Sequence, residues 1–205
     1  SCFRPPNLAC LLLAAGGASR FGGRKQLAPI GGQPLIRHTL AQLMPIFGDH
    51  LFVVLGAYRQ AVEPEITGQC RIIDHEQWQA GMGTSIAQGV SKIIRHDHYD
   101  GIMIALADQV AISRDDYQRL VEHYHGEHII AAQFENRLAA PALFPHRYFD
   151  RLQQLQGDTG ARRLLREHPA SVIGVDLPAA AVDIDTPADL KAFRATGYDS
   201  RQSAL

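Results

Sequence analysis

The sequence predicts an α/β fold with a mostly parallel sheet and helices on both faces, and two observations support this. Short apolar runs of strand length alternate along the chain with segments of helical periodicity. The runs at 51–55 and 101–107 also lack polar alternation, which is typical of strands covered on both sides. We expect the 205 residues to form one domain, with a core from 7 to 195 and a flexible tail from 196 to 205.

The first half of the chain supplies three strands and three helices. Apolar runs predict the strands, at 8–14, 51–55 and 70–73. Pro34 follows a Gly-Gly turn and suits the first position of a helix that reaches Phe47. A short helix is expected around 58–65. After a loop at 74–82, either Gly83 or Thr84 caps a third helix, whose apolar face ends near Ile94.

The second half continues the alternation. The strand at 101–107 is apolar throughout and ends at Asp108. Ser113 caps a helix that ends near Tyr124, and Thr186 with Pro187 opens a last helix that ends near Ala195. Between these helices we expect strands or extended segments at 129–132, 142–144, 171–175 and 181–184, and helices at 148–155 and 160–167.

A glycine-rich loop follows the first strand. Residues 11–25 read LLLAAGGASRFGGRK, so an apolar run stops abruptly at glycines. Glycine lets backbone N–H groups come close to a ligand, and consecutive N–H groups aimed into a concavity bind anions. The cations Arg20, Arg24 and Lys25 suit a polyphosphate better than a single carboxylate. We interpret the loop as a triphosphate site. The alternative for Lys25 is an exposed loop lysine.

Two well-known phosphate loops do not match this segment. Gly17 and Gly22 have the spacing of a P-loop, but Gly23 stands where that motif requires lysine. The dinucleotide fingerprint requires a second glycine two places after the first, and Ala18 stands there after Gly16. The next strand also ends without the acidic residue that would bind a ribose. The loop is therefore a third kind of glycine-rich loop.

Composition excludes several classes of protein. The net charge of −1 argues against bulk nucleic-acid binding, which requires a basic surface. The apolar run at 8–15 is too short for a membrane span, so no membrane partner is expected. Three sparse cysteines without a CxxC pair fit a reducing compartment, and we predict a cytoplasmic protein. No acidic residue precedes Asp49, so the glycine loop lies in a basic segment, as an anion site should.

Acidic residues follow the strands at the edge where ligands of α/β sheets bind. Asp108 ends the strand at 101–107, and Asp183 and Asp185 lie near the last helix. Mg²⁺ prefers one or two carboxylates together with phosphate oxygens and water, so Asp108 and one of the later acids could share a metal. The alternatives are a turn aspartate at 108 and helix-start acids at 183 and 185, which the helix dipole favours.

Three further segments could carry chemistry. Ser85 could contact a base or ribose, or it could be a plain helix cap. The turn at 157–160 precedes Arg162 and Arg163 and could bind an anionic group of a second substrate, or it could only connect two helices. A histidine cluster could bind metal, although its spacing matches no known site and a polar helix end explains it; it comprises His123, His125 and His128.

Five segments in order resemble one family. They are LLLAAGGASRFGGRKQL, EQWQAGMGTSIAQGV, LADQ, GDTGARRLL and DIDTPADL. They are similar to the motifs of the MobA-like nucleotidyltransferases, in the branch that includes molybdenum cofactor cytidylyltransferase. LAAG, rather than LAGG, resembles the cytidylyl branch rather than the guanylyl branch. The resemblance implies a Rossmann-like sheet of the nucleotide-diphospho-sugar transferase type. It also implies attack by an acceptor phosphate on the α-phosphorus of CTP, with release of pyrophosphate.

The resemblance also implies roles for individual residues. The catalytic residues would be Arg20, Lys25 and Asp108, and the Mg²⁺ ligands Asp108 and Asp185. The nucleotide would also contact Leu13, Ala14, Ala15, Gly16, Gly17, Gly81 and Ser85. The acceptor, molybdopterin or its molybdenum form, would contact Arg137, Pro141, Asp158 and Gly160. A molybdoenzyme or its chaperone would be the protein partner.

The sequence departs from the family pattern at two places. Ala18 replaces the usual serine of the glycine loop, and Ala107 and Val110 flank Asp108 and Gln109 where the family has glycine and proline. The carboxylate is retained. Other hypotheses stay open at this point: a guanylyltransferase, a nucleotidyltransferase that acts on sugar or polyol phosphates, a nicotinamide-dependent oxidoreductase, and a nucleotide-binding regulator without catalysis.

Overall fold

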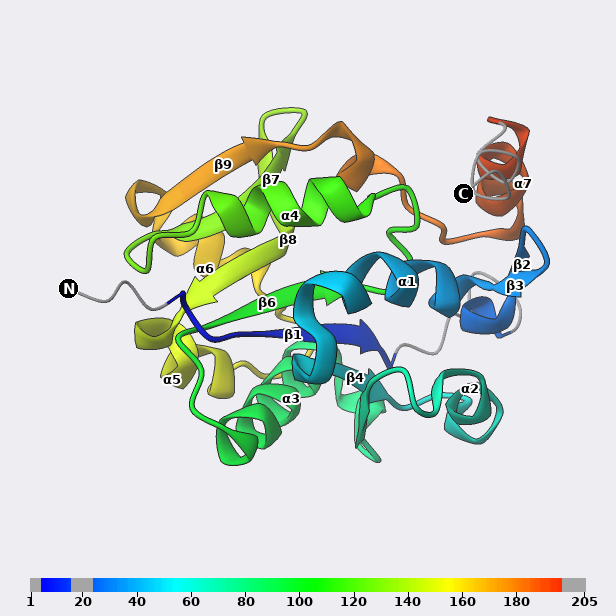
Figure 1. The fold of residues 1–205 in the computed structure, drawn as a ribbon, viewed down its shortest axis with the longest axis horizontal. Coiled ribbons are helices and arrows are strands. Elements are labelled where there is room, and N and C mark those ends of the chain that lie inside the picture. The colour runs from blue at the N-terminus through cyan, green and yellow to red at the C-terminus, as the bar shows by residue number, and fades with distance from the viewer. Residues whose placement is uncertain (1–4, 16–23, 197–205) are drawn as a thin grey trace.

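The computed structural model describes residues 5–15 and 24–196. Within them a seven-stranded sheet runs through the molecule in the order β5-β4-β1-β6-β8-β7-β9 (Figure 1). Its strands are β1 (Leu8–Ala14), β4 (Leu51–Leu55), β5 (Arg71–Asp74), β6 (Gly101–Leu106), β7 (Ile129–Phe134), β8 (Arg137–Pro145) and β9 (Val172–Asp176). The predicted α/β class with a mostly parallel sheet is confirmed.

One strand runs against the others. β1, β4, β5 and β6 pair in parallel, and β7 pairs in parallel with β9. β8 is antiparallel to both β6 and β7. Glu135 and Asn136 connect β7 to β8, and both have positive φ, as the tightest hairpin turns require. The sequence predicted only 142–144 of this strand, because its first half contains polar and small residues.

Helices cover both faces of the sheet, because alternate strand residues point to opposite sides. On one face Leu12 and Val53 pack with α1 (Leu35–Phe47), α2 (Arg59–Ile66) and α4 (Arg114–Glu122). On the other face Leu11 and Val54 pack with α3 (Met82–His96), α5 (Phe149–Gln153) and α6 (Arg162–Glu167). Each face thus has its own apolar core.

A third, smaller core lies at one end of the molecule. The hairpin of β2 (Pro29–Ile30) and β3 (Gln33–Pro34) packs there with α7 (Pro187–Ala195). Figure 1 shows α7 beside this hairpin, away from the main sheet. Ile30, Ile184 and Phe193 are buried in the contact. The small core joins the segment after the glycine loop to the C-terminal helix, although the two are far apart in sequence.

Several element boundaries differ from the sequence predictions. Pro34 belongs to β3, so α1 begins at Leu35. Gly81, not Gly83 or Thr84, is the N-cap of α3. α6 begins at Arg162 rather than 160. Of the segment expected to be extended at 181–184, Ala181 ends a short 3-10 helix, η7 (Pro178–Ala181), and Val182 has an extended backbone. The other short 3-10 helices among the described residues are η2 (Lys25–Leu27), η3 (Gly48–His50), η4 (Trp78–Ala80), η5 (His146–Tyr148) and η6 (Pro169–Ser171).

The predicted helix starts at Ser113 and Thr186 are confirmed. Ser113 with Asp116 and Thr186 with Asp189 exchange side-chain and backbone hydrogen bonds at the starts of α4 and α7. The predicted tail, 196–205, lies outside the described residues except for its first position. No helix within the described part of the chain is long and apolar enough to cross a membrane.

Candidate functional site

Three predicted site residues meet at the carboxyl edge of the sheet. The Lys25 ammonium lies 3.0 Å from an Asp108 oxygen and 3.7 Å from an Asp185 oxygen. The Lys25 side chain is only 12% exposed, whereas Asp108 and Asp185 are 21% and 39% exposed. Segments near the start, middle and end of the chain thus place one cation between two carboxylates.

Local structure holds each of these residues in place. Asp108 follows the end of β6, and Lys25 opens η2, whose last turn is closed by a bond from the Ala28 N–H to the Lys25 carbonyl. Asp185 precedes α7, and its backbone N–H donates to Asp189, which also accepts from the N–H of Thr186. The capping box of α7 therefore fixes the backbone that carries Asp185.

A third carboxyl group, Asp183, interacts with the same cluster. Burial raises the pKa of Asp183, and the charges of Asp108 and Asp185 raise it further, while Lys25 and Arg162 lower it. The sequence left open whether Asp183 or Asp185 is the second metal ligand. In the structure Asp185 contacts Lys25 directly, and Asp183 lines the neighbouring cavity.

The carboxylates fit a divalent cation that is held jointly with a ligand. Asp108 and Asp185 already share the positive charge of Lys25, so both lie within reach of one cation. In the described residues no three His, Cys, Asp or Glu side chains are grouped closely enough to hold a metal, and this includes His123, His125 and His128. Two carboxylates completed by phosphate oxygens and water suit Mg²⁺.

The predicted nucleotide-contacting residues that the structure describes lie at the end of β1 and at the start of α3. Leu13 and Ala14 end β1, Ala15 directly follows it, and all three are buried. Ser85 is buried in the first turn of α3, where its hydroxyl donates to the carbonyl of Gly81 at 3.2 Å. The backbone N–H of Ser85 also donates to the Gly81 carbonyl, so Ser85 lies inside the helix and Gly81 is its N-cap. Gly16, Gly17 and Arg20 lie outside the described residues.

Two glycine-containing turns, at 81–83 and 157–160, contact each other beside the start of α3. The N–H of Gly83 donates to the carbonyl of Gly157 at 2.8 Å, and the N–H of Gly157 donates to the Thr84 hydroxyl at 3.3 Å. A Cβ atom on Gly83 would lie 2.3 Å from the Thr159 carbonyl oxygen, and one on Gly81 would lie 2.4 Å from the Gly157 backbone. The close contact joins a predicted nucleotide segment to a predicted acceptor segment, and glycine is required for it.

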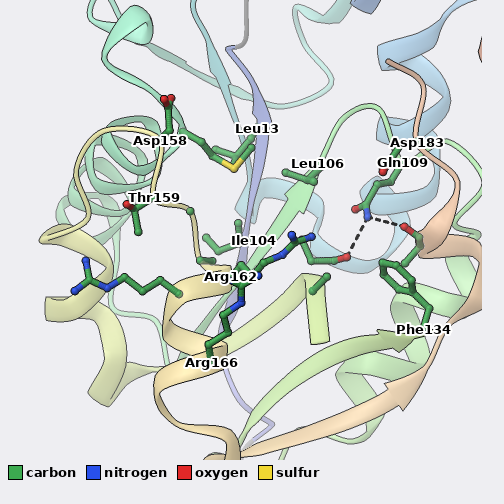
Figure 2. Close-up of a pocket in the computed structure, with 17 residues that line it drawn as sticks. Leu13, Ile104, Leu106, Gln109, Phe134, Asp158, Thr159, Arg162, Arg166 and Asp183 are labelled. Atoms are coloured by element: carbon green, nitrogen blue, oxygen red, sulfur yellow. Dashed lines mark hydrogen bonds between the residues drawn. The ribbon is translucent and has the colours of Figure 1, made fainter. Parts of the chain in front are cut away.

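A cavity of about 610 Å³ opens beside the end of β6 (Figure 2). Apolar side chains form much of its wall, namely Leu13, Ile104, Leu106 and Phe134. Arg162, Arg163 and Arg166 of α6 also line it, as do Asp158 and Gly160. Cations around an apolar hollow suit an anionic ligand with a hydrophobic body.

The structure brings only part of the predicted acceptor set to this cavity. Asp158 and Gly160 line it, whereas Arg137 and Pro141 are not among its lining residues. Arg137 is exposed, and its guanidinium lies 3.9 Å from Glu135. Sequence reasoning assigned no role to Gln109 or Arg166, which do line it. The spacing of Arg162 and Arg166, one helical turn apart, was the available signal for the latter.

Comparisons with known proteins agree on the family. The sequence model of the MobA-like NTP transferase domain matches residues 10–172. The purine catabolism protein PucB of Bacillus subtilis is 29% identical over 93% of this chain and 98% of its own length. The nicotine blue oxidoreductase of Paenarthrobacter nicotinovorans is 31% identical over 88% of this chain and 93% of its own length.

Solved structures share the fold. A homologue of rv0371c from Mycobacterium sp. strain JC1 has a TM-score of 0.79 at 25% identity and covers 96% of this chain and 98% of its own. Rv0371C of Mycobacterium tuberculosis, solved as a complex with manganese, has a TM-score of 0.72 at 23% identity, with 91% and 97% covered. These likenesses span almost the whole of both chains.

Proposed function

Because this chain belongs to the MobA-like NTP transferase family, we propose that it is a Mg²⁺-dependent cytidylyltransferase. It transfers CMP from CTP to the terminal phosphate of molybdopterin or the molybdenum cofactor and releases pyrophosphate. The observation that carries this proposal is the contact of Lys25 with both Asp108 and Asp185, next to a cavity lined by cations. Nucleotide, metal and acceptor can then meet at one edge of the sheet.

Different residues serve different steps of the proposed reaction. An oxygen of the acceptor phosphate attacks the α-phosphorus, and the bond from that phosphorus to the β-phosphate oxygen breaks. Asp108 and Asp185 would hold the metal, which supplies electrostatic stabilisation of the phosphates when bound. Lys25 and Arg20 oppose the charge that develops on the phosphates. The end of β1, including Ala14, and the start of α3 position the nucleotide.

The cavity is the proposed acceptor site. Arg162 and Arg166 would hold an anionic group, and the apolar wall would accept the body of the acceptor. Arg137 and Pro141 remain proposed contacts of the same substrate. The proposed protein partner is a molybdoenzyme or its chaperone, which would receive the product. We assign the reaction to the cytoplasm, because three sparse cysteines fit a reducing compartment.

Specificity is tested by measuring pyrophosphate release with Mg²⁺ for each pairing of CTP, GTP, ATP or UTP with molybdopterin or a sugar or polyol phosphate. We expect release with CTP and molybdopterin and little with the other pairs. Release with GTP, or with a sugar or polyol phosphate, would identify the guanylyl or sugar-phosphate alternative. Tight CTP binding without turnover for any acceptor would instead indicate a regulator that binds nucleotide.

A second candidate function is an oxidoreductase. It is favoured by one observation, the 31% identity to a protein named nicotine blue oxidoreductase. The missing dinucleotide fingerprint after the first strand counts against a nicotinamide cofactor here. The test is a fluorescence titration with NADH, NADPH and CTP. Binding of NADH or NADPH without binding of CTP would favour this candidate over nucleotidyl transfer.

A further inference from the structure

Gln109 occupies an unusual position in the wall of the cavity. It directly follows Asp108, and only 3% of its surface is exposed. Its side-chain nitrogen donates to the carbonyl of Ala140 at 3.0 Å and to the carbonyl of Ala180 at 3.2 Å. Figure 2 shows Gln109 among the lining residues, with both of these bonds drawn. Gln109 thus ties β8 and η7 to the end of β6.

These two bonds fix the orientation of the amide. A carbonyl oxygen accepts only from a donor, so the NH₂ end must face Ala140 and Ala180, and the oxygen must occupy the other end. That oxygen is buried and has no hydrogen-bond partner in the described part of the chain. Buried polar atoms are almost always paired, so an unpaired acceptor in a cavity wall indicates a missing donor.

The other residues that line the cavity indicate what kind of molecule it would bind. Arg162 and Arg166 lie on α6 and provide the cations, whereas Gln109 follows β6. The wall includes Leu106 and the aromatic ring of Phe134, which suit the flat face of a ring, and Asp158, Thr159 and Asp183 add polar groups to it. The arrangement fits a flat heterocycle with an N–H group at one end and an anionic group at the other.

We propose that Gln109 is a specificity-determining residue, whose side-chain oxygen accepts a hydrogen bond from an exocyclic NH₂ group of a heterocyclic acceptor. The anionic group of this acceptor lies against Arg162 and Arg166. This inference rests on the proposed function, since it assigns the cavity to the acceptor. Beyond that function, Gln109 would make the cavity prefer heterocycles that carry an NH₂ donor over heterocycles that lack it.

The test is a fluorescence titration with two pterin probes. Pterin-6-carboxylate has an exocyclic NH₂ group and a carboxylate, and its N²,N²-dimethyl derivative lacks the exocyclic donor. The wild-type chain should bind the parent about tenfold more tightly, as expected for one well-placed hydrogen bond. In Gln109→Met this preference should disappear, mainly through weaker binding of the parent.

Comparison of the two probes separates recognition from a structural role. If Gln109 only tied β8 to η7, Gln109→Met would weaken both probes alike and keep the preference. Arg166→Gln is the matched control, because it should weaken both probes and leave the preference intact. Equal binding of both probes to the wild-type chain overturns the inference even if Gln109→Met does not fold.

CTP binding in the same preparation separates a failure of the role of Gln109 from a failure of the proposed acceptor. Pterin binding without a preference for the parent contradicts the role of Gln109 and leaves the proposed acceptor standing. Tight Mg²⁺-dependent CTP binding with no binding of either pterin contradicts the pterin acceptor and the role of Gln109 together.

Discussion

Asp108→Asn is expected to lower the rate of metal-dependent nucleotidyl transfer by about 10³-fold, which corresponds to roughly 4 kcal/mol of lost transition-state stabilisation. Asparagine keeps the shape of the side chain but removes the charge that a divalent cation requires. The measurement is pyrophosphate release from CTP at saturating acceptor and increasing Mg²⁺. The unfolding temperature should change little, because Asp108 is partly exposed and, among the described residues, forms a salt bridge with Lys25 alone.

Asp115→Asn is the matched control for this experiment. Asp115 lies on α4, is 89% exposed, and has a distant contact to Arg114 at 3.9 Å. The same loss of one carboxylate there should leave turnover and metal dependence unchanged. A normal rate for Asp108→Asn at low Mg²⁺ would remove Asp108 from the metal site.

Lys25→Met is expected to have two effects of opposite sign. The value of kcat/KM for CTP should fall by about 10²-fold, because one preorganised cation on the transferring phosphates is lost. Binding of Mn²⁺ without nucleotide should become tighter, because Lys25 no longer competes for the oxygens of Asp108 and Asp185. The measurements are steady-state kinetics and titration of free Mn²⁺ by electron paramagnetic resonance.

Lys92→Met provides the control, since Lys92 is exposed on α3 and contacts none of these carboxylates. It removes the same charge and should change neither quantity. Weaker Mn²⁺ binding by Lys25→Met would contradict the competition between Lys25 and the metal. Unchanged kcat/KM would contradict the contact with the phosphates.

The parallel half of the sheet could be predicted because its strands are continuous apolar runs. β1, β4 and β6 bury both faces, so composition alone marks them. The direction of β8 could not be predicted in this way, since a strand's partner and direction depend on distant segments. The start of α3 was misplaced because the contacts that fix Gly81 come from residue 157 and its neighbours.

The site, too, combines features that the local sequence predicts with features that depend on contacts between distant segments. Lys25, Asp108 and Asp185 were expected together because the carboxyl ends of parallel strands share one edge. The cavity was predicted less completely, because its wall combines β6, β8, α6 and η7, which no local pattern relates. The unpaired oxygen of Gln109 follows from bonds to Ala140 and Ala180, which only the folded chain brings near.

The fate of the α-phosphorus of CTP tests most directly whether this chain transfers CMP to molybdopterin. CTP labelled with ³²P at the α-position is incubated with the chain, Mg²⁺ and molybdopterin, and the products are separated. The label should move to the acceptor as CMP, with one unlabelled pyrophosphate released for each transfer and none without Mg²⁺. Label that remains in CTP, or appears only as free CMP, CDP or inorganic phosphate, would contradict nucleotidyl transfer to this acceptor at the site formed by Lys25, Asp108 and Asp185.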